Sequence, residues 1–308
     1  MRELLIIQPS SLGDIVHGLQ VTAALKAQQP DWRVSWIVRD IFAPLVRASS
    51  VVDQIFVFRR HGGVRGFFQL MREVRQHHFD VVMDFQGLLR SALMIKWTHG
   101  MRKIGRANGL EASTLFYDEK IEMPNSGPVH PLELLLQFCK AVGAKPELAG
   151  PLHFRDHAKL NLSFMEPRNG LAPILMFPDS RLDVTRWGGF SQLSALLVRE
   201  SGRKVVWAGH AYLPCREAFP DGAFVNLTGN TSLASLTALI SHAEWVVAND
   251  SGALQLAVAL GVKTLGIFGP TDPRLTGPYP PTNTDKNVVV QAPVGDLQLL
   301  PAKDVFAR

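Results

Sequence analysis

The chain has 308 residues, a formal net charge of +5 and 46% hydrophobic residues, which is enough for two domains of ordinary size with sizeable cores. The positive excess is too small to indicate a nucleic-acid partner by itself, but it fits an anionic ligand or an anionic membrane face. The two cysteines are far apart without metal-ligand spacing, which favours reduced thiols in a cytoplasmic protein, and no apolar stretch reaches transmembrane length, so any membrane contact is expected to be peripheral.

The first half of the chain alternates between expected strands and expected helices. The N-terminal apolar run is too short for a signal peptide and is expected to be the first strand. We expect strands at residues 4–8, 33–38, 54–58 and 80–84, and helices at residues 15–27, 41–48, 64–77 and 88–98. This alternation predicts a parallel sheet that is covered by helices on both faces.

Asp14 lies near the start of the first expected helix, after a loop of small and hydroxyl residues. One interpretation is a carboxylate that complements the helix dipole. The other is a general base exposed at the carboxyl ends of the strands. The loop lacks a G-x-G-x-x-G pattern, so the dinucleotide-binding fingerprint is absent.

The connecting segments of the first half are basic, including residues 59–61, 90, 102–103 and 106. Arg59, Arg60, Arg90 and Arg106 fall at or near loops expected on the same sheet edge as Asp14. Because arginine matches the geometry of carboxylates and phosphates, we favour an anionic-substrate site over simple solvated charges.

Two aromatic residues in the helix expected at 64–77, Phe67 and Phe68, lie near Arg65. Such a cluster can touch a membrane surface. Packing of the helix on the core is the interpretation we favour.

The second half repeats the alternation after a helix expected at residues 130–142 and a mixed connection at residues 143–168. Strands are expected at residues 173–177 and 204–208, an edge strand or loop at 223–227, and helices at 190–200 and 232–242. Residues 178–187 form a long polar loop. We therefore expect two facing α/β domains, residues 1–160 and 161–308, with ligands in a cleft where the strand ends of both halves meet.

The stretch from residue 244 to 269 is expected to run strand, tight turn, helix, strand. The helix N-terminus after the turn offers free backbone N–H groups at the carboxyl edge of the sheet, where a phosphate is held favourably. Asp250 is anionic and is expected to cap the helix, while Ser251 and Gly252 present donors. An ordinary helix cap without a ligand is an equal alternative from this turn alone.

Five motifs of the chain resemble glycosyltransferase family 9 in their order and spacing. They are SSLGD at 10–14, DFQGLLRS at 84–91, LFY at 115–117, DSG at 250–252 and FGPTDP at 268–273. The family includes the ADP-heptose:lipopolysaccharide heptosyltransferases, and the chain is most similar to the heptosyltransferase I branch. The resemblance covers nearly the whole chain.

The resemblance implies a GT-B fold, in which two Rossmann-like domains with parallel sheets face a central cleft. It implies acceptor binding by residues 1–160 and nucleotide-sugar binding by residues 161–308. The implied reaction is an inverting, metal-independent transfer of heptose from ADP-heptose to the Kdo inner core of lipopolysaccharide, without a cofactor. The sequence has no D-x-D of the kind that metal-dependent transferases use for Mg²⁺.

The resemblance also implies roles for individual residues. Asp14 matches the general base, and four basic positions match acceptor binding: Arg59, Arg60, Arg90 and Arg106. The implied donor-binding residues are Ser10, Ser11, Gly13, Thr185, Arg186, Asp250, Ser251, Gly252, Gln255, Thr271 and Asp272.

The chain departs from the family pattern at three places, all on the donor side. Gln255 stands where the family usually has a histidine, and a glutamine cannot carry a proton or a positive charge. Thr185 stands where the family usually has a lysine, with Arg186 beside it. The glutamate expected to meet the nucleotide ribose has no clear equivalent in residues 210–214.

These departures leave alternatives open: a family 9 transferase with a different nucleotide-sugar donor or acceptor, or a degenerate sugar-nucleotide-binding protein. The missing glycine fingerprint disfavours a dinucleotide oxidoreductase. The expected partners are a nucleotide-sugar donor and an anionic glycolipid acceptor, with no nucleic acid. We expect a cytoplasmic monomer that touches the inner face of the inner membrane peripherally.

Overall fold

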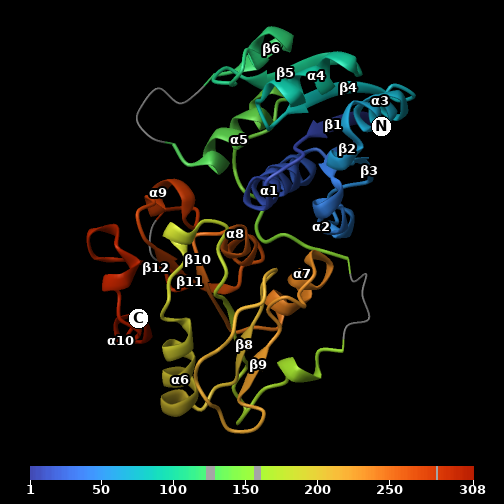
Figure 1. Cartoon of the computed structure of the whole chain (residues 1–308). Helices are drawn as coiled ribbons and strands as arrows, with labels where there is room; N and C mark the ends of the chain where they lie inside the picture. Colours follow the sequence, from blue (N-terminus) through green and yellow to red (C-terminus); the bar gives the residue numbers. More distant parts are fainter. Residues whose placement is uncertain (123–128, 156–160, 282–283) are drawn as a thin grey trace. The chain divides into compact units, whose positions relative to one another are not determined.

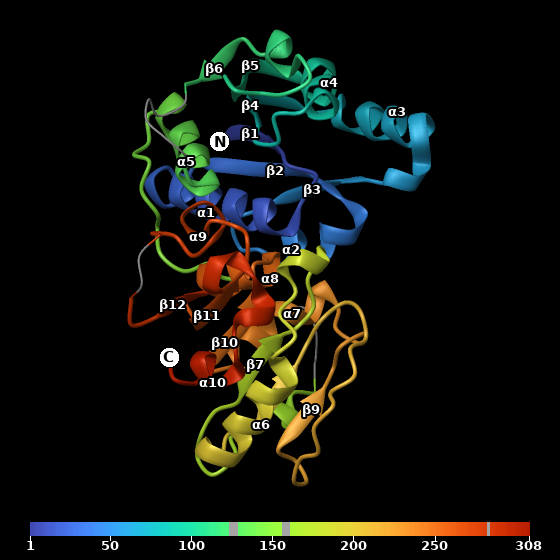
Figure 2. The same cartoon turned by 60° about the vertical axis from the view of Figure 1, so that its left-hand side comes forward.

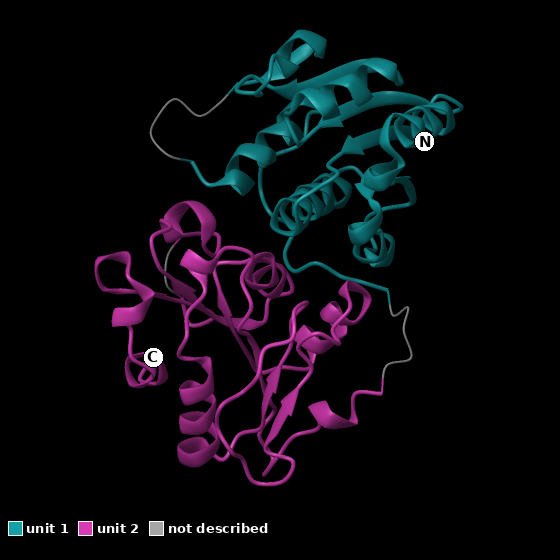
Figure 3. Ribbon diagram, in the orientation of Figure 1, with its two compact units in different colours: residues 1–155 teal, residues 156–308 magenta. Residues whose placement is uncertain are grey.

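The structure is a computed structural model that describes residues 1–122, 129–155, 161–281 and 284–308. The chain divides into two compact units, residues 1–155 and 156–308 (Figure 3). The domain boundary predicted at residue 160 lies outside the described residues. No helix within the described ranges combines the length and the hydropathy needed to cross a bilayer.

Unit 1 is a six-stranded parallel sheet between two layers of helices (Figure 1). Helices α1, α2 and α5 lie on one face of the sheet, and α3 and α4 lie on the other. The strands run in the order β3-β2-β1-β4-β5-β6. Their bounds are β1 (Arg2–Ile7), β2 (Trp32–Arg39), β3 (Gln54–Phe58), β4 (His78–Asp84), β5 (His99–Arg106) and β6 (Glu119–Ile121). The helices are α1 (Leu12–Gln28), α2 (Ala43–Ala48), α3 (Gly63–Val74), α4 (Leu89–Trp97) and α5 (Pro131–Ala141).

Strand β5 corrects the prediction of a basic connecting segment at residues 102–103. The segment HGMRKIGR lacks the continuous apolar run of a strand buried on both faces, because it lies near one edge of the sheet. Arg102 pairs with Glu119 of β6 at 2.7 Å. Gly105 is required by packing, since a Cβ there would lie 2.3 Å from the ring of Tyr117. Arg106 is therefore the last residue of a strand.

Unit 2 is a second six-stranded parallel sheet, with the order β12-β11-β10-β7-β8-β9. Helices α6 and α10 cover one face, and α7 and α8 cover the other. The strands are β7 (Ile174–Phe177), β8 (Val205–Trp207), β9 (Phe224–Asn226), β10 (Trp245–Asn249), β11 (Lys263–Phe268) and β12 (Asn287–Gln291). The helices are α6 (Phe190–Ser201), α7 (Leu233–Ser241), α8 (Gly252–Ala259), α9 (Pro273–Thr276) and α10 (Ala302–Phe306). The segment predicted as an edge strand or loop is an edge strand, β9.

Both sheets have the same topology, that of the Rossmann fold. In each unit the first strand, β1 or β7, lies beside the fourth, β4 or β10, and the chain leaves these two strands in opposite directions along the sheet. The loops that follow the two strands therefore diverge at the carboxyl edge and leave a crevice where ligands bind in such folds. The functional residues of each unit are therefore expected at its switch point.

Candidate functional site

Asp14 lies at the switch point of unit 1, in the first turn of α1. Its Oδ2 accepts hydrogen bonds from the backbone N of Ser11 at 2.9 Å and from the Ser11 hydroxyl at 2.8 Å. The carboxylate therefore closes the helix N-terminus in a capping box. Both bonds fall on one oxygen, and Oδ1 accepts no hydrogen bond from the part of the chain that the structure describes. The cap leaves this second oxygen open to a proton.

Asp84 ends β4 at the same switch point and is completely buried. Its Oδ1 accepts hydrogen bonds from the backbone N of Gln86 at 3.0 Å and of Gly87 at 3.1 Å, and its Oδ2 accepts one from the Tyr117 hydroxyl at 2.8 Å. Burial raises the pKa of Asp84 to about 6, although these hydrogen bonds favour the charged form. The buried carboxyl fixes the turn that follows β4.

One hydrogen bond connects this turn to the Asp14 loop, and a packing contact connects the turn to Arg106. The side-chain oxygen of Gln86 accepts a hydrogen bond from the backbone N of Ser10 at 3.2 Å. Gly87 has a φ of +69°, and a Cβ there would lie 3.2 Å from Cδ of Arg106, so the arginine stem packs against the turn. Burial lowers the pKa of Arg106, while the charges of Asp14 and Asp84 oppose that effect. Arg106 therefore carries its charge close to both carboxyl groups.

The Asp84 carboxyl makes the stability of the protein depend on pH. Its folded pKa is raised, so the native state holds the proton more tightly between about pH 4 and pH 6, and the free energy of unfolding falls as pH rises through that window. We expect Asp84→Asn to make this fall in the free energy of unfolding smaller, by up to about 3 kcal/mol, because the asparagine does not titrate. The asparagine oxygen can accept the two backbone bonds, and its amide nitrogen can donate to the Tyr117 oxygen.

Urea unfolding of both proteins at pH 4.5 and pH 7.5 checks this prediction. Other carboxyl groups contribute equally to both proteins, so the difference between their pH dependences isolates Asp84. Identical pH dependences would mean that Asp84 titrates in its usual range.

Three predicted acceptor arginines lie at the carboxyl edge of the sheet in unit 1. Arg59 and Arg60 follow β3, and Arg90 lies in the first turn of α4. All three are exposed, and none forms an ion pair with the residues that the structure describes. Their charges are therefore available to an anion.

At the switch point of unit 2, two residues separate β10 from α8, and the prediction that Asp250 caps this helix is wrong. Ser251 is the N-cap residue in an extended conformation, and no side chain caps the helix. Asp250 instead accepts a hydrogen bond from the Thr276 hydroxyl at 2.9 Å on Oδ2. Burial raises the pKa of Asp250, opposed by the hydroxyls of Thr271 and Thr276. The first-turn N–H groups of α8 are consequently not occupied by a side-chain cap.

The polar loop after β7 is tied to β10 by Asn249. Its side-chain nitrogen donates to the Pro178 carbonyl at 3.0 Å, and its oxygen accepts from the backbone N of Trp187 at 3.0 Å. Thr185 is buried within this loop, and its hydroxyl lies 2.6 Å from that of Ser180. Thr185 therefore holds the loop together.

Arg186 lines a pocket of about 390 Å³ with Pro270 and Gly295. Its guanidinium lies 3.0 Å from Asp183 and 3.9 Å from Asp179, and its side chain is 39% exposed. The pocket lies beside the loop that follows β11, so the loops after β7 and β11 meet here. The pocket lies at the carboxyl edge, where ligands bind in such folds, and Arg186 is the positive charge in its lining, beside Asp183 and Asp296.

Two further predicted donor residues, Gln255 and Asp272, hold the short helix α9. Gln255, buried on α8, donates to the carbonyls of Thr276 and Gly277, the latter at 3.1 Å. Asp272 accepts from the backbone N of Arg274 at 2.9 Å and pairs with its guanidinium. These contacts fix the loop that presents Thr276 to Asp250.

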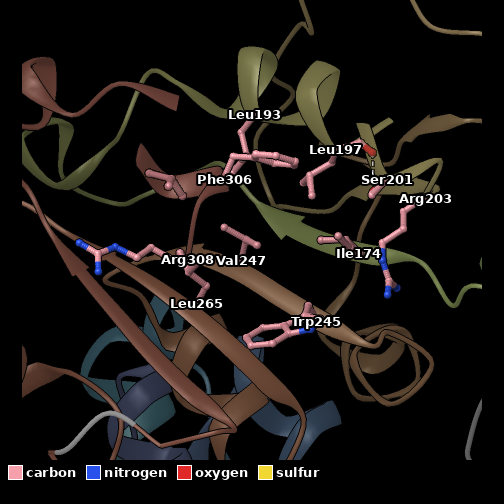
Figure 4. Close-up of a pocket in the computed structure, with 11 residues that line it drawn as sticks. Ile174, Leu193, Leu197, Ser201, Arg203, Trp245, Val247, Leu265, Phe306 and Arg308 are labelled. Carbon is pink, nitrogen blue, oxygen red and sulfur yellow. Dashed lines mark hydrogen bonds between the residues drawn. The ribbon is translucent and has the colours of Figure 1, made fainter. Parts of the chain in front are cut away.

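A second pocket in unit 2, of about 240 Å³, lies between α6, α10 and the sheet (Figure 4). It touches Ile174 and Trp245, the first residues of β7 and β10, so it lies at the amino ends of the strands. Arg203 at its rim pairs with Glu244. Ligands in parallel sheets bind at the opposite edge, so this apolar space is not part of the candidate site.

Sequence reasoning missed the residues that hold these loops, namely Asp84, Gln86, Tyr117 and Asn249. Asp84, Gln86 and Tyr117 belong to the family-like motifs at residues 84–91 and 115–117, and this membership is the feature of the sequence that could have identified them. Their partners lie far away in sequence, such as the 33 positions between Asp84 and Tyr117. Only the fold brings them together.

Comparison with known proteins matches this geometry to one family. The family described as Glycosyltransferase family 9 (heptosyltransferase) matches residues 67–294. Lipopolysaccharide heptosyltransferase 1 of Escherichia coli O18:K1:H7 is 26% identical over an alignment of 326 residues, which covers 98% of this chain and 95% of that protein.

Two solved structures share the fold. The Escherichia coli heptosyltransferase WaaC with ADP superposes with a TM-score of 0.81 at 23% identity, covering 98% of this chain and 97% of that one. A family 9 glycosyl transferase from Veillonella parvula superposes with a TM-score of 0.84 at 16% identity, covering 99% and 95%. These similarities confirm the predicted GT-B fold of two Rossmann-like domains. Because the family match spans most of the sequence, this chain belongs to glycosyltransferase family 9, the heptosyltransferases.

Proposed function

We propose that the protein transfers heptose from ADP-heptose to the Kdo inner core of a lipopolysaccharide intermediate, with inversion at the anomeric carbon and without a metal ion. The observation that carries this proposal is the Asp14 carboxylate, which is fixed through one oxygen at the switch point of unit 1. Relatives named lipopolysaccharide heptosyltransferase 1 support the acceptor class. WaaC structures with ADP and with ADP-2-deoxy-2-fluoro heptose support the donor.

Asp14 would act as the general base of this reaction. Its Oδ1 takes the proton from the acceptor hydroxyl while that oxygen bonds to the anomeric carbon and the bond from this carbon to the diphosphate breaks. Arg59, Arg60, Arg90 and Arg106 would hold the carboxylates and phosphates of the acceptor. The neighbouring Ser10, Ser11 and Gly13 would contact the transferred sugar.

Unit 2 would hold the donor. The diphosphate would lie at the N-terminus of α8, against the backbone N–H groups of Ser251 and Gly252, and Arg186 would add a positive charge. These groups stabilise the charge that grows on the leaving ADP. Asp250, Gln255, Thr271 and Asp272 would shape the donor site, and Thr185 would hold the loop that carries Arg186.

The acceptor class also determines the proposed place of action. A lipid-borne acceptor requires the protein to reach the membrane, and we propose peripheral contact with the inner membrane from the cytoplasmic side. The protein would act as a monomer, without nucleic acid.

A second candidate, a related activity with another nucleotide-sugar, is favoured by Gln255. Its amide nitrogen is engaged with the carbonyls of Thr276 and Gly277, so the place of the family histidine is occupied by a neutral structural group. The same replacement is also compatible with a degenerate protein that binds a sugar nucleotide but does not transfer the sugar.

A thermal-shift screen of ADP-heptose, ADP-glucose, GDP-mannose and UDP-glucose separates these functions. At about 100 times its Kd, the true donor adds about 2.7 kcal/mol of stability, which corresponds to a rise in Tm of about 5 °C or more. We expect this rise with ADP-heptose. A shift with a GDP- or UDP-sugar alone contradicts the proposed donor, and a shift with ADP-heptose without transfer supports a degenerate binding protein.

A further inference from the structure

One face of unit 1 exposes apolar side chains among arginines. Val64 and Phe68 of α3 are 72% and 48% exposed, and Trp97 at the end of α4 is 37% exposed. The Phe68 and Trp97 rings meet edge to face at 5.4 Å. Together with the exposed arginines of the same region, these residues form what we call the α3–α4 face: Val64, Arg65, Phe68, Arg72, Arg75 and Trp97.

The helix is already anchored to the core by its other side. Leu70, Met71 and Val74 are buried, and Phe67 packs against the same core cluster. Positions 64, 68, 72 and 75 follow helical spacing, so they share one side of α3, next to the side that packs on that core. Figure 2 shows α3 at the periphery of unit 1. Phe67 therefore contributes to the packing of α3 on unit 1, whereas the Phe68 side chain remains exposed.

The charge of this face is not compensated. Residues 54–79 contain five arginines and a single acidic residue, Glu73. Within the described ranges, Arg65, Arg72 and Arg75 form no ion pair, whereas exposed arginines elsewhere, such as Arg2 and Arg274, pair with aspartates. The Arg75 guanidinium lies over the Trp97 ring at 6.0 Å.

We propose that the α3–α4 face docks the protein on an anionic lipid bilayer. Exposed aromatic rings enter the interface between headgroups and acyl chains, and flanking arginines are attracted to anionic headgroups while their stems cover apolar surface. The choice of a lipid surface over a protein partner rests on the proposed function, in which the acceptor is carried by a lipid. The face itself contains none of the residues assigned to substrate binding.

Co-sedimentation of the full chain with vesicles tests this proposal. The vesicles contain phosphatidylethanolamine with phosphatidylglycerol, or phosphatidylcholine alone. We expect binding to the anionic vesicles that weakens with added salt, and little binding to the neutral ones. Arg72→Gln with Arg75→Gln should weaken the partition coefficient about 25-fold, at about fivefold per arginine. Phe68→Ser should weaken it severalfold.

Matched controls come from unit 2, where Tyr212 is 69% exposed and Arg216 is also exposed. Tyr212→Ser and Arg216→Gln should leave vesicle binding unchanged. Equal losses in these controls, or no binding to anionic vesicles, overturn the proposal. A dimer in sedimentation velocity that Phe68→Ser converts to monomer also overturns it in favour of self-association. Thermal shift by ADP-heptose is measured in parallel, so failure of docking is distinguishable from failure of the proposed transfer.

Discussion

Replacing Asp14 with asparagine is expected to lower kcat by about 10³-fold while the protein stays folded. The asparagine oxygen can accept the two hydrogen bonds that Ser11 now donates to Oδ2, so the helix cap persists. The amide cannot take a proton from an acceptor hydroxyl. Steady-state transfer kinetics, with Tm measured on the same samples, check both halves of the prediction.

Ser11→Ala is the matched variant for this prediction. It removes the hydroxyl bond at 2.8 Å but keeps the backbone bond and the carboxylate. We expect it to cost about 1 kcal/mol of stability and, through the lost contact with the donor sugar, to raise the KM for the donor, while kcat stays within a few-fold of the unmodified protein. If Asp14→Asn retained full activity, or if the two variants lost activity equally, Asp14 would be a helix cap and not the base.

The alternation of buried strands and helices could be predicted because its signal is local. Strand β3 lies at the predicted residues, and the strand, turn and helix around Ser251 follow from an apolar run that small polar residues interrupt. Strand β5 could not be recognised in the same way, because its charged side chains are matched by partners such as Glu119 on the neighbouring strand. The information that makes this segment a strand lies outside it.

The loops of the candidate site could also be located from sequence, but the roles of single side chains within them could not. Asp250 precedes a helix and was predicted to be its cap, yet its hydroxyl partner, Thr276, is 26 residues away in sequence. Thr185 and Gln255 look like ligand-binding polar residues in sequence, and the structure shows both engaged in holding loops. The contacts of a polar residue near a switch point show which loop it supports, and these contacts could not be read from the sequence.

Arg186→Ala is expected to weaken ADP binding about 10- to 100-fold. Arg186 lines the pocket at the carboxyl edge of unit 2, and a charge-assisted hydrogen bond to a phosphate contributes about 1.5–3 kcal/mol. Arg186→Lys should recover part of the loss, because it keeps the charge but not the two-pronged geometry. Isothermal titration with ADP measures these affinities without the acceptor.

The arginine control for this series is Arg199→Ala. Arg199 is 67% exposed on α6 and pairs loosely with Glu217 at 3.8 Å, so its removal changes the net charge equally without touching the pocket. Thr185→Ala provides a second comparison, because Thr185 lies in the loop that carries Arg186. The loss of its buried hydroxyl should lower Tm, since the hydroxyl supports this loop. Equal affinities for Arg186→Ala and Arg199→Ala would mean that Arg186 only balances Asp183 and Asp179, and that the diphosphate is held by the α8 N-terminus without it.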